Sequence, residues 1–411
     1  MRVSPFAALR PQPELAASVA AVPYDVVNTE EARRLAEGQP LSFLHVSRSE
    51  IDLPAGTNPY SDAVYERALQ NFKSLEQKAL LREATPSTYL YRQEMTLLGK
   101  SVSQTSLVCC CHIDEYASGI IKKHEKTRRD KEDDRTRHVL ALNANAGPVF
   151  LMYRDRPGIA ELMARDTAQA PLYDFVAVDG VRHSVWRSTD AAQYVAEFGR
   201  VEAAYIADGH HRAASAARAG VELRAGNPKH DGSEEYNWFL CALFPASQLT
   251  ILPYHRVVKD LNGLTTTALL EQLRQVGSVA ATDNPEPPAP GSFCVYVERQ
   301  WYRVDLPAHT IDASDPVGSL DYSLLGERVL GPILGIGDIR TDQRIDFVGG
   351  IRGPGELVKR VDSGRDAVAF SMHATTIEHL LRVADAGQIM PPKSTWFEPK
   401  LRSGLLVHTL E

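Results

Sequence analysis

The strongest local signal in the sequence is the stretch VEAAYIADGHHRAASAARAG, residues 201–220. Its first seven residues are mostly apolar and predict a strand, and the polar pair Asp208-Gly209 follows as a turn. The alanine-rich continuation predicts a helix, and Gly220 is a residue that can terminate it. A strand that passes directly into a helix indicates a fold in which both element types are interspersed.

Helix and strand patterns also alternate on the N-terminal side of this stretch. Residues 88–91 and 106–108 have β-type composition, and Ser61 can cap a preceding helix. The apolar residues of that helix recur at helical spacing, at Val64, Ala68, Leu69, Phe72 and Leu75. We therefore expect a mixed α/β (α+β) fold.

Residues 283–291, DNPEPPAPG, form the clearest break in the pattern, because the prolines exclude a regular helix or an interior strand. The break is either a linker or a long surface loop. We take it as a boundary and expect two packed α/β regions, 1–282 and 292–411.

The C-terminal region has element signals of its own. Residues 293–297 are typical of a strand. Thr375 and Glu378 have the spacing of a capping box at the start of a helix, and Gly387 marks the end of that helix.

The composition excludes several classes of protein. The 411 residues carry a net charge of −7, which gives no general attraction to nucleic acid or to acidic membranes. No apolar run is long enough to cross a bilayer, and the N-terminus contains prolines in place of a signal-like apolar core. Cys109, Cys110 and Cys111 are consecutive and suit buried thiols better than a disulfide framework. We expect a cytoplasmic protein without nucleic-acid or membrane partners.

The segment Asp208-Gly209-His210-His211-Arg212 is the best candidate site. Free N–H groups at a helix start favour an anion, and Gly209 permits the tight turn before it. Arg212 can bind a phosphate, His210 and His211 can donate hydrogen bonds or move protons, and Asp208 could hold a divalent ion. An exposed polar turn with capping histidines is the alternative.

A second candidate is the charged block from Asp114 to Arg135. On a helix beginning near Lys122, one face would carry His124, Thr127, Lys131 and Asp134 or Arg135. A solvated helix with many ion pairs is the alternative. A zinc-protease motif is excluded because residue 128 is Arg where that motif has His.

A third candidate is Lys393-Ser394-Thr395, within the segment 390–400 that ends at Lys400. The Lys-Ser-Thr order is similar to the end of a phosphate loop, but the glycines that precede it there are absent. The segment could contact an anion, and an incidental surface loop is the alternative. Neither a dinucleotide-binding fingerprint nor a Gly-x-Ser-x-Gly elbow is present.

These blocks resemble the uncharacterised family named domain of unknown function 1015. The resemblance extends over most of the chain, through Pro23-Tyr24-Asp25, residues 115–135 and residues 208–212. At the C-terminus it includes Pro392, Lys393, Ser394, Thr395, Phe397, Pro399, Lys400 and Gly404.

Asp-Gly-His-His-Arg is also similar to the signature of free-serine kinases with a ParB/sulfiredoxin-like fold. That resemblance implies a nucleotide-binding core of this kind, elaborated here by further strands and helices. It implies that the turn at Asp208 to Arg212 holds nucleotide phosphates and that a separate glutamate acts as base. Glu115 and Glu125 are the candidates for the base on chemical grounds alone.

The leading hypothesis is a kinase that transfers a phosphoryl group from ATP or ADP, with Mg²⁺, to a small amino or hydroxy acid such as serine. Asp208 would hold the metal. The expected catalytic residues are Asp208, His210, His211, Glu115 and Glu125. The expected nucleotide contacts are Gly209, Arg212, His124, Lys131, Arg135, Lys393, Ser394, Thr395 and Lys400.

Two alternatives stay open. The chain could be a nucleotide-binding regulator without kinase activity. It could instead be a metal-dependent hydrolase of a small phosphorylated substrate, with Asp208, His210 and His124 as ligands. The expected partners are a small molecule and a nucleotide, and a homodimer is left open.

Overall fold

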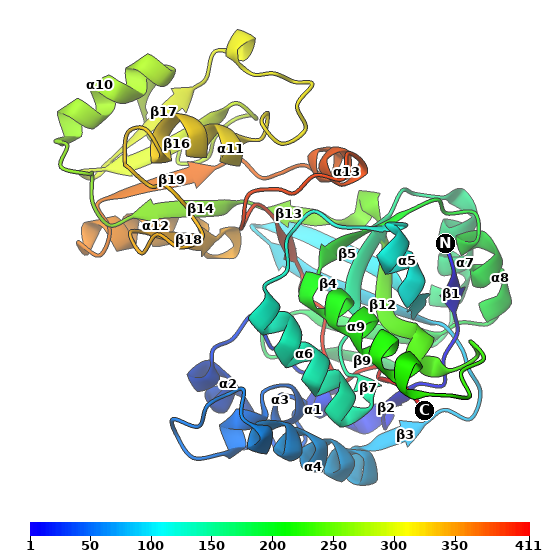
Figure 1. Ribbon diagram of the computed structural model, residues 1–411. Helices are drawn as coiled ribbons and strands as arrows, with labels where there is room; N and C mark the ends of the chain where they lie inside the picture. The colour runs from blue at the N-terminus through cyan, green and yellow to red at the C-terminus, as the bar shows by residue number, and fades with distance from the viewer. The chain divides into compact units, whose positions relative to one another are not determined.

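A computed structural model describes all residues from Met1 to Glu411. The chain divides into two compact units. Unit 1 contains residues 1–249 together with 399–411, and unit 2 contains residues 250–398. Helices and strands are interspersed in both, so the prediction of a mixed α/β fold is confirmed (Figure 1). No helix combines the length and apolar character that crossing a membrane requires.

Unit 1 is built on a nine-stranded sheet in the order β6-β11-β8-β12-β5-β4-β10-β9, with β1 on β5. Most neighbours are antiparallel, and only the pairs β11/β6 and β12/β8 are parallel. The strands are β1 (Val3–Ser4), β4 (Tyr89–Leu97), β5 (Lys100–His112), β6 (Ile121–Lys122), β8 (Val149–Tyr153), β9 (Tyr173–Val176), β10 (Arg182–Arg187), β11 (Ala204–Asp208) and β12 (Trp238–Pro245). The strands predicted near residues 90, 107 and 204 are confirmed.

Helices cover this sheet and a second apolar core beside it. They are α1 (Ala16–Val19), α2 (Thr29–Ala36), α3 (Leu44–Ser47), α4 (Asp62–Ala79), α5 (Ile113–Ser118), α6 (Arg129–Leu142), α7 (Pro157–Thr167), α8 (Ala191–Phe198) and α9 (His210–Gly226). Helix α4 confirms the predicted apolar spacing, although the hydroxyl of Ser61 makes no capping hydrogen bond. The thiols of residues 109–111 are buried in β5.

Helix α9 packs along α6 and against the sheet (Figure 1). Its buried face consists largely of alanines, which allow neighbouring backbones to approach closely. The prediction that Gly220 ends this helix is wrong, because α9 continues to Gly226. A Cβ at Gly220 would overlap the carbonyl oxygen of Tyr236 and lie 2.8 Å from Cδ1 of Ile113. Gly220 therefore permits close packing.

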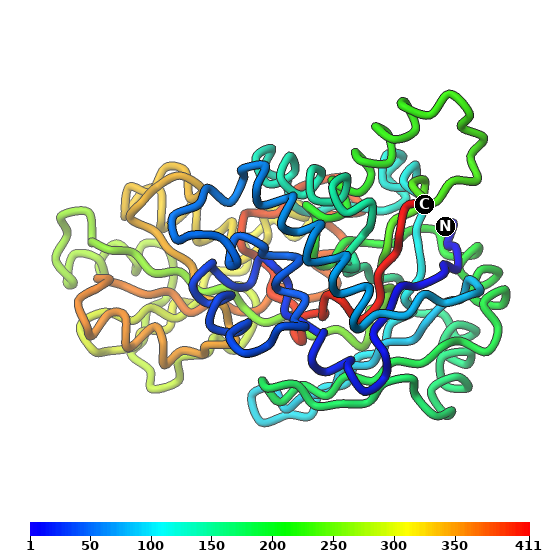
Figure 2. Tube along the Cα trace, turned by 90° about the horizontal axis from the view of Figure 1, so that it is seen from below, coloured from blue at the N-terminus to red at the C-terminus, as the bar shows by residue number.

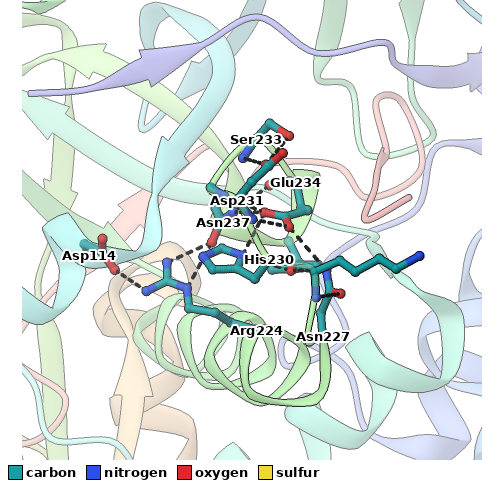
Figure 3. A network of polar contacts seen from close by, with 11 residues as sticks. Asp114, Arg224, Asn227, His230, Asp231, Ser233, Glu234 and Asn237 are labelled. Carbon is teal, nitrogen blue, oxygen red and sulfur yellow. Dashed lines mark hydrogen bonds and ion pairs between the residues drawn. The ribbon is translucent and has the colours of Figure 1, made fainter.

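The C-terminal end of α9 is held by a polar network (Figure 3). Arg224 donates from Nε and Nη2 to Oδ1 of Asn237, at 3.1 and 2.8 Å, and from Nη1 to Asp114. Glu234 accepts the N–H groups of Asp231 and Gly232, and its Oε2 lies 2.8 Å from Nδ1 of His230. These contacts fix the loop that leads from α9 to β12.

The last residues of the chain return to unit 1 and lie beside its N-terminal segment (Figure 2). Backbone bridges join Leu9 to Val407 and Ala21 to Ser403. Two further small sheets pair β2 (Leu9–Pro11) with β3 (Leu80–Arg82) and β7 (Ala144–Asn145) with β21 (His408–Thr409). The unit is thus closed by strands from both ends of the chain.

Unit 2 contains a six-stranded antiparallel sheet in the order β15-β17-β16-β19-β14-β18. Its strands are β14 (Tyr254–Val258), β15 (Ser278–Thr282), β16 (Ser292–Val297), β17 (Gln300–Asp305), β18 (Ile345–Gly349) and β19 (Val368–Met372). Its helices are α10 (Thr266–Val276), α11 (Asp321–Leu325), α12 (Gly353–Asp362) and α13 (Ile377–Asp385), and a two-stranded sheet pairs β13 (Thr250–Leu252) with β20 (Trp396–Glu398).

Two predictions for the C-terminal half need correction. The proline-rich segment 283–291 is a loop between β15 and β16 inside unit 2, so it does not separate the regions 1–282 and 292–411. The cap of α13 is Thr376, whose hydroxyl accepts the N–H of His379. Thr375 donates its hydroxyl hydrogen to the carbonyl of Ser394.

Candidate functional site

The site begins where β11 passes into α9. Gly209 has φ = +87°, a conformation that glycine adopts without a Cβ penalty, and His210 starts the helix directly after it. No side chain caps the helix, so the first-turn N–H groups have no side-chain acceptor. The predicted strand–turn–helix is confirmed, and it presents an uncapped helix start of the kind that favours anions.

Asp208 ends β11 and makes the central ion pair of the site. Its Oδ2 lies 2.7 Å from Nζ of Lys400, and its Oδ1 accepts the N–H of Gly209 at 2.8 Å. Burial acts to raise the pKa of Asp208, but Lys400, Arg212 and the Gly209 N–H outweigh it and hold that pKa well below its usual value. The carboxylate is therefore ionised near pH 7.

His210 and His211 form hydrogen bonds that hold the loop before α6 against the start of α9. The N–H of His124 donates to Nε2 of His210 at 3.5 Å, and the two rings lie edge to face with centroids 4.5 Å apart. The N–H of Arg128 donates to Nε2 of His211 at 3.0 Å. Burial lowers the pKa of both histidines below the usual value, with His124 adding to the effect on His210. Both are therefore neutral near pH 7, with the proton on Nδ1.

These contacts also correct the predicted helix near Lys122. Helix α6 begins only at Arg129, and residues 123–128 form a loop. Two backbone N–H groups of this loop donate hydrogen bonds to His210 and His211. His124 and Lys131 therefore do not share a helix face. Burial lowers the pKa of His124 to about 4, so this imidazole is also neutral.

A pocket that is open to solvent lies beside the helix start. Two guanidinium groups reach it, Arg135 from α6 and Arg212 from α9, and both lie over the ring of Tyr24, at 4.2 and 5.4 Å from its centroid. The other lining residues are Ser47, His138, Val139, Asn145, Ala146, Gly147, Val149, Ser215, Ala216, Leu240 and Ser403.

A smaller pocket is formed by Asp25 and Asp208 together with Pro23, Phe150, Arg212 and Leu401. Arg212 lines both pockets. Its Nη1 donates to the carbonyl of Pro148 at 3.1 Å, and its Nη2 lies 3.6 Å from Asp25. A single guanidinium thus joins the cationic pocket to the pair of carboxylates.

The sequence matches the model of one protein family over residues 3–323, and that family is described as protein of unknown function (DUF1015). The chain belongs to the DUF1015 family. No curated protein sequence matches it.

Several solved structures resemble this DUF1015 protein, each over 73% of its length. A conserved hypothetical protein from Pyrococcus furiosus is 13% identical, with 94% of that chain covered and a TM-score of 0.35. A free serine kinase in complex with AMP is 13% identical, with 91% covered and a TM-score of 0.35. SbnI with a C-terminal truncation, from Staphylococcus aureus, is 12% identical, with 87% covered and a TM-score of 0.38.

The structure brings together a subset of the predicted residues of this DUF1015 protein. Asp208, Gly209, Arg212, Arg135 and Lys400 meet around the two pockets. Lys131 lies apart from the pocket lining and donates to the hydroxyl of Tyr60 at 2.7 Å.

The two predicted glutamates also lie outside the pocket lining. Glu115 is buried in α5, and its Oε1 accepts the N–H of Arg2 at 2.6 Å. Glu125 is exposed in the loop after β6.

Lys393, Ser394 and Thr395 belong to unit 2. Lys393 has φ = +56°, and its ammonium lies 5.5 Å from the ring centroid of Tyr254. Ser394 is buried and donates its hydroxyl hydrogen to the carbonyl of Pro391 at 2.7 Å. Local hydrogen bonds therefore shape this loop.

Four pocket residues have no role that their sequence context predicts, namely Tyr24, Asp25, Ser47 and His138. The first two stand in the Pro23-Tyr24-Asp25 block, which pointed to the family without indicating its chemistry. Ser47 and His138 had no local signal, because only the packing of α3 and α6 brings them to the pocket.

The carboxylates available at the site suit Mg²⁺ that arrives with a nucleotide. No group of three His, Cys, Asp or Glu residues is arranged to hold a metal ion alone. The smaller pocket offers two carboxylates, and Mg²⁺ commonly takes one or two together with phosphate oxygens and water. His210 and His124 do not join Asp208 as a ligand set, which removes support from the hydrolase alternative.

Proposed function

We propose that this protein binds the phosphates of ATP or ADP at the start of α9 and transfers a phosphoryl group to the hydroxyl of a small acid. The observation that carries the proposal is the guanidinium group of Arg212, which lines both pockets beside an uncapped helix N-terminus. Guanidinium groups bind phosphate oxygens in a bidentate manner, and the helix N–H groups add further donors.

Phosphoryl transfer depends mainly on positioning and on neutralising negative charge, which suits this site. A bond forms between the acceptor oxygen and the terminal phosphorus while the bond to the leaving nucleotide oxygen breaks. Arg212 stabilises the charge on the transferred group, and Lys400 keeps Asp208 ionised and oriented. Bound Mg²⁺, held by Asp208 and Asp25, would supply further neutralisation of the phosphate oxygens.

A base must take the proton of the acceptor hydroxyl. The contact between Glu115 and Arg2 disfavours Glu115, so we propose the exposed Glu125, in the loop that His210 and His211 hold. The neutral histidines act as positioning residues for this loop. We retain Lys393, Ser394 and Thr395 as proposed nucleotide contacts, and the cytoplasm as the proposed location, where ATP and ADP are available.

The test is nucleotide consumption by purified protein with a panel of small hydroxy and amino acids, compared between variants. Arg212→Ala and Asp208→Ala should each lower turnover by about a hundredfold or more while circular dichroism stays unchanged. Arg218→Ala is the matched control, because Arg218 lies on the same helix and pairs with Asp133 outside both pockets.

Near-normal turnover in either variant would contradict the proposal. Tight nucleotide binding without any phosphorylated product in mass spectra would favour the regulatory alternative.

A further inference from the structure

The wall of the larger pocket has an unusual balance of charge. It contains two arginines, but Asp and Glu are absent from its lining. Each arginine has a carboxylate partner that lies outside that lining: Asp134 accepts from Arg135 at 2.8 Å, and Asp25 lies 3.6 Å from Arg212. A ligand in the pocket therefore meets cationic groups and no anionic side chain.

Asn145 and Ser47 supply uncharged hydrogen-bonding groups to the pocket. Asn145 accepts the N–H of Leu240 with Oδ1, which leaves its Nδ2 group as a donor. The hydroxyl of Ser47 is buried and has no hydrogen-bond partner in the protein. A buried hydroxyl without a partner is costly, and a ligand oxygen would satisfy it.

His138 supplies an acceptor. Its Nε2 lies 3.0 Å from the carbonyl oxygen of Val46, so the proton of the neutral ring is on Nε2 and Nδ1 carries a lone pair. Burial lowers the pKa of His138 to about 4, with Arg135 adding to the effect, so the ring is neutral near pH 7. A ligand hydroxyl could donate to Nδ1 and accept from Ser47, whereas an ammonium could only donate.

We propose that this pocket binds the phosphoryl acceptor and that the acceptor is a small hydroxy acid without an ammonium group, in preference to an amino acid. The inference rests on the proposed function and refines its substrate class. The carboxylate of the acceptor meets Arg135, and Arg212, which lines both pockets, is left to the nucleotide phosphates. Its hydroxyl groups meet Ser47, Asn145 and His138. An α-ammonium would lose its hydration without gaining a carboxylate, which disfavours serine.

Glycerate and serine are a matched pair of probes, because they differ only in a hydroxyl or an ammonium group at C2. Calorimetric titrations of each into the wild-type chain, in buffer and with saturating ADP, measure the preference without requiring turnover. Glycerate should bind at least about tenfold more tightly than serine. Equal or tighter binding of serine, or no binding of either, would overturn the inference.

A variant that adds a negative charge to the pocket also tests the preference for an acceptor without an ammonium group. Val139 lies on α6 and lines the pocket, so Val139→Asp places a carboxylate where none exists. Relative to the uncharged control Val139→Asn, this variant should shift the preference toward serine by at least about tenfold. An unchanged preference in a folded Val139→Asp protein would count against the inference.

The two proposals fail in distinguishable ways. ADP titrated into the same preparation reports on the nucleotide site at the start of α9. ADP binding without glycerate binding would refute the acceptor class alone, and a protein that binds neither would contradict both proposals.

Discussion

Tyr24 is the residue that the two pocket arginines share. Its ring is buried, with the guanidinium of Arg135 at 4.2 Å and that of Arg212 at 5.4 Å from its centroid. Contacts of this kind contribute through the face of the ring. The hydroxyl is not required for them. The ring therefore orients both arginines toward the pocket.

We expect Tyr24→Ala to weaken ADP binding by about tenfold, because the guanidinium group of Arg212 loses the ring surface that orients it. Tyr24→Phe keeps the ring and should bind ADP within about a factor of two of wild type. Isothermal titration of ADP with MgCl₂ measures both variants. Equal losses in the two variants would assign the effect to the hydroxyl and contradict this account.

At the residue scale, the sequence predicted which residues form the site more accurately than it predicted the contacts that those residues make. Asp208, Arg212, Arg135 and Lys400 were predicted as site residues and meet around the pockets. The histidine pair was expected to contact phosphate, yet one ring nitrogen of each accepts a backbone N–H. A motif indicates which groups are present, whereas tertiary packing determines which atoms are already engaged.

Helix α9 is the element that supports the site, and Gly220 sets its distance from neighbouring backbone. Gly220→Ala should lower the free energy of unfolding by about 1–3 kcal/mol, because its Cβ would overlap the carbonyl of Tyr236. Gly226→Ala, near the end of the same helix, is the matched control, since a Cβ there meets nothing within 4 Å. Urea denaturation compares the two, and equal effects would contradict the packing role.

The stability that the loop after α9 contributes should depend on pH through the carboxyl group of Glu234. Burial acts to raise the pKa of Glu234, but backbone N–H groups of Glu234, Asp231 and Gly232 outweigh it and lower the pKa to about 2 from the ordinary value of 4.5. A carboxylate with a depressed folded-state pKa contributes stability above pH 4.5, and that contribution is lost as the pH falls toward 2.

Glu234→Gln lacks this contribution at every pH. The difference in unfolding free energy between wild type and Glu234→Gln should therefore be largest near neutral pH and shrink between pH 4.5 and 2. Urea titrations at several pH values measure this difference. A difference that stays constant with pH would show that the carboxylate charge has no part in holding the loop.

At the element scale, local patterns predicted the strand–turn–helix of residues 204–226 but not every boundary. Gly220 is read as a helix terminator from sequence, whereas its role depends on Tyr236 and Ile113 packing against it. The start of α6 at Arg129 depends on the two histidines, which lie far along the chain. Such boundaries are set by contacts that no local window contains.

At the scale of the whole molecule, unit 1 is discontinuous and unit 2 is continuous. The segment 399–411 supplies Lys400, the bridge of Val407 to Leu9 and strand β21. The proline-rich segment 283–291 resembles a linker in sequence, but its flanking strands belong to one sheet. No local sequence signal shows that the C-terminal segment packs into unit 1. None shows that the strands on either side of residues 283–291 belong to one sheet.

This division predicts the behaviour of fragments. Residues 250–398, expressed alone, should unfold cooperatively, because they contain a complete sheet and apolar core. A chain ending at residue 398 should have a less stable unit 1, since it lacks the strand and ion pair of the C-terminal segment. Calorimetric melting of both fragments checks this, and a truncated chain as stable as the full one would refute it.

The proposed function requires that the start of α9 binds the nucleotide phosphates beside Arg212. A crystal structure of the protein with ADP and Mg²⁺ would locate these phosphates. We expect phosphate oxygens within hydrogen-bond distance of Arg212 and of the N–H groups at His210 and His211. Ordered ADP whose phosphates lie away from Arg212 and the first turn of α9 would contradict the proposed function.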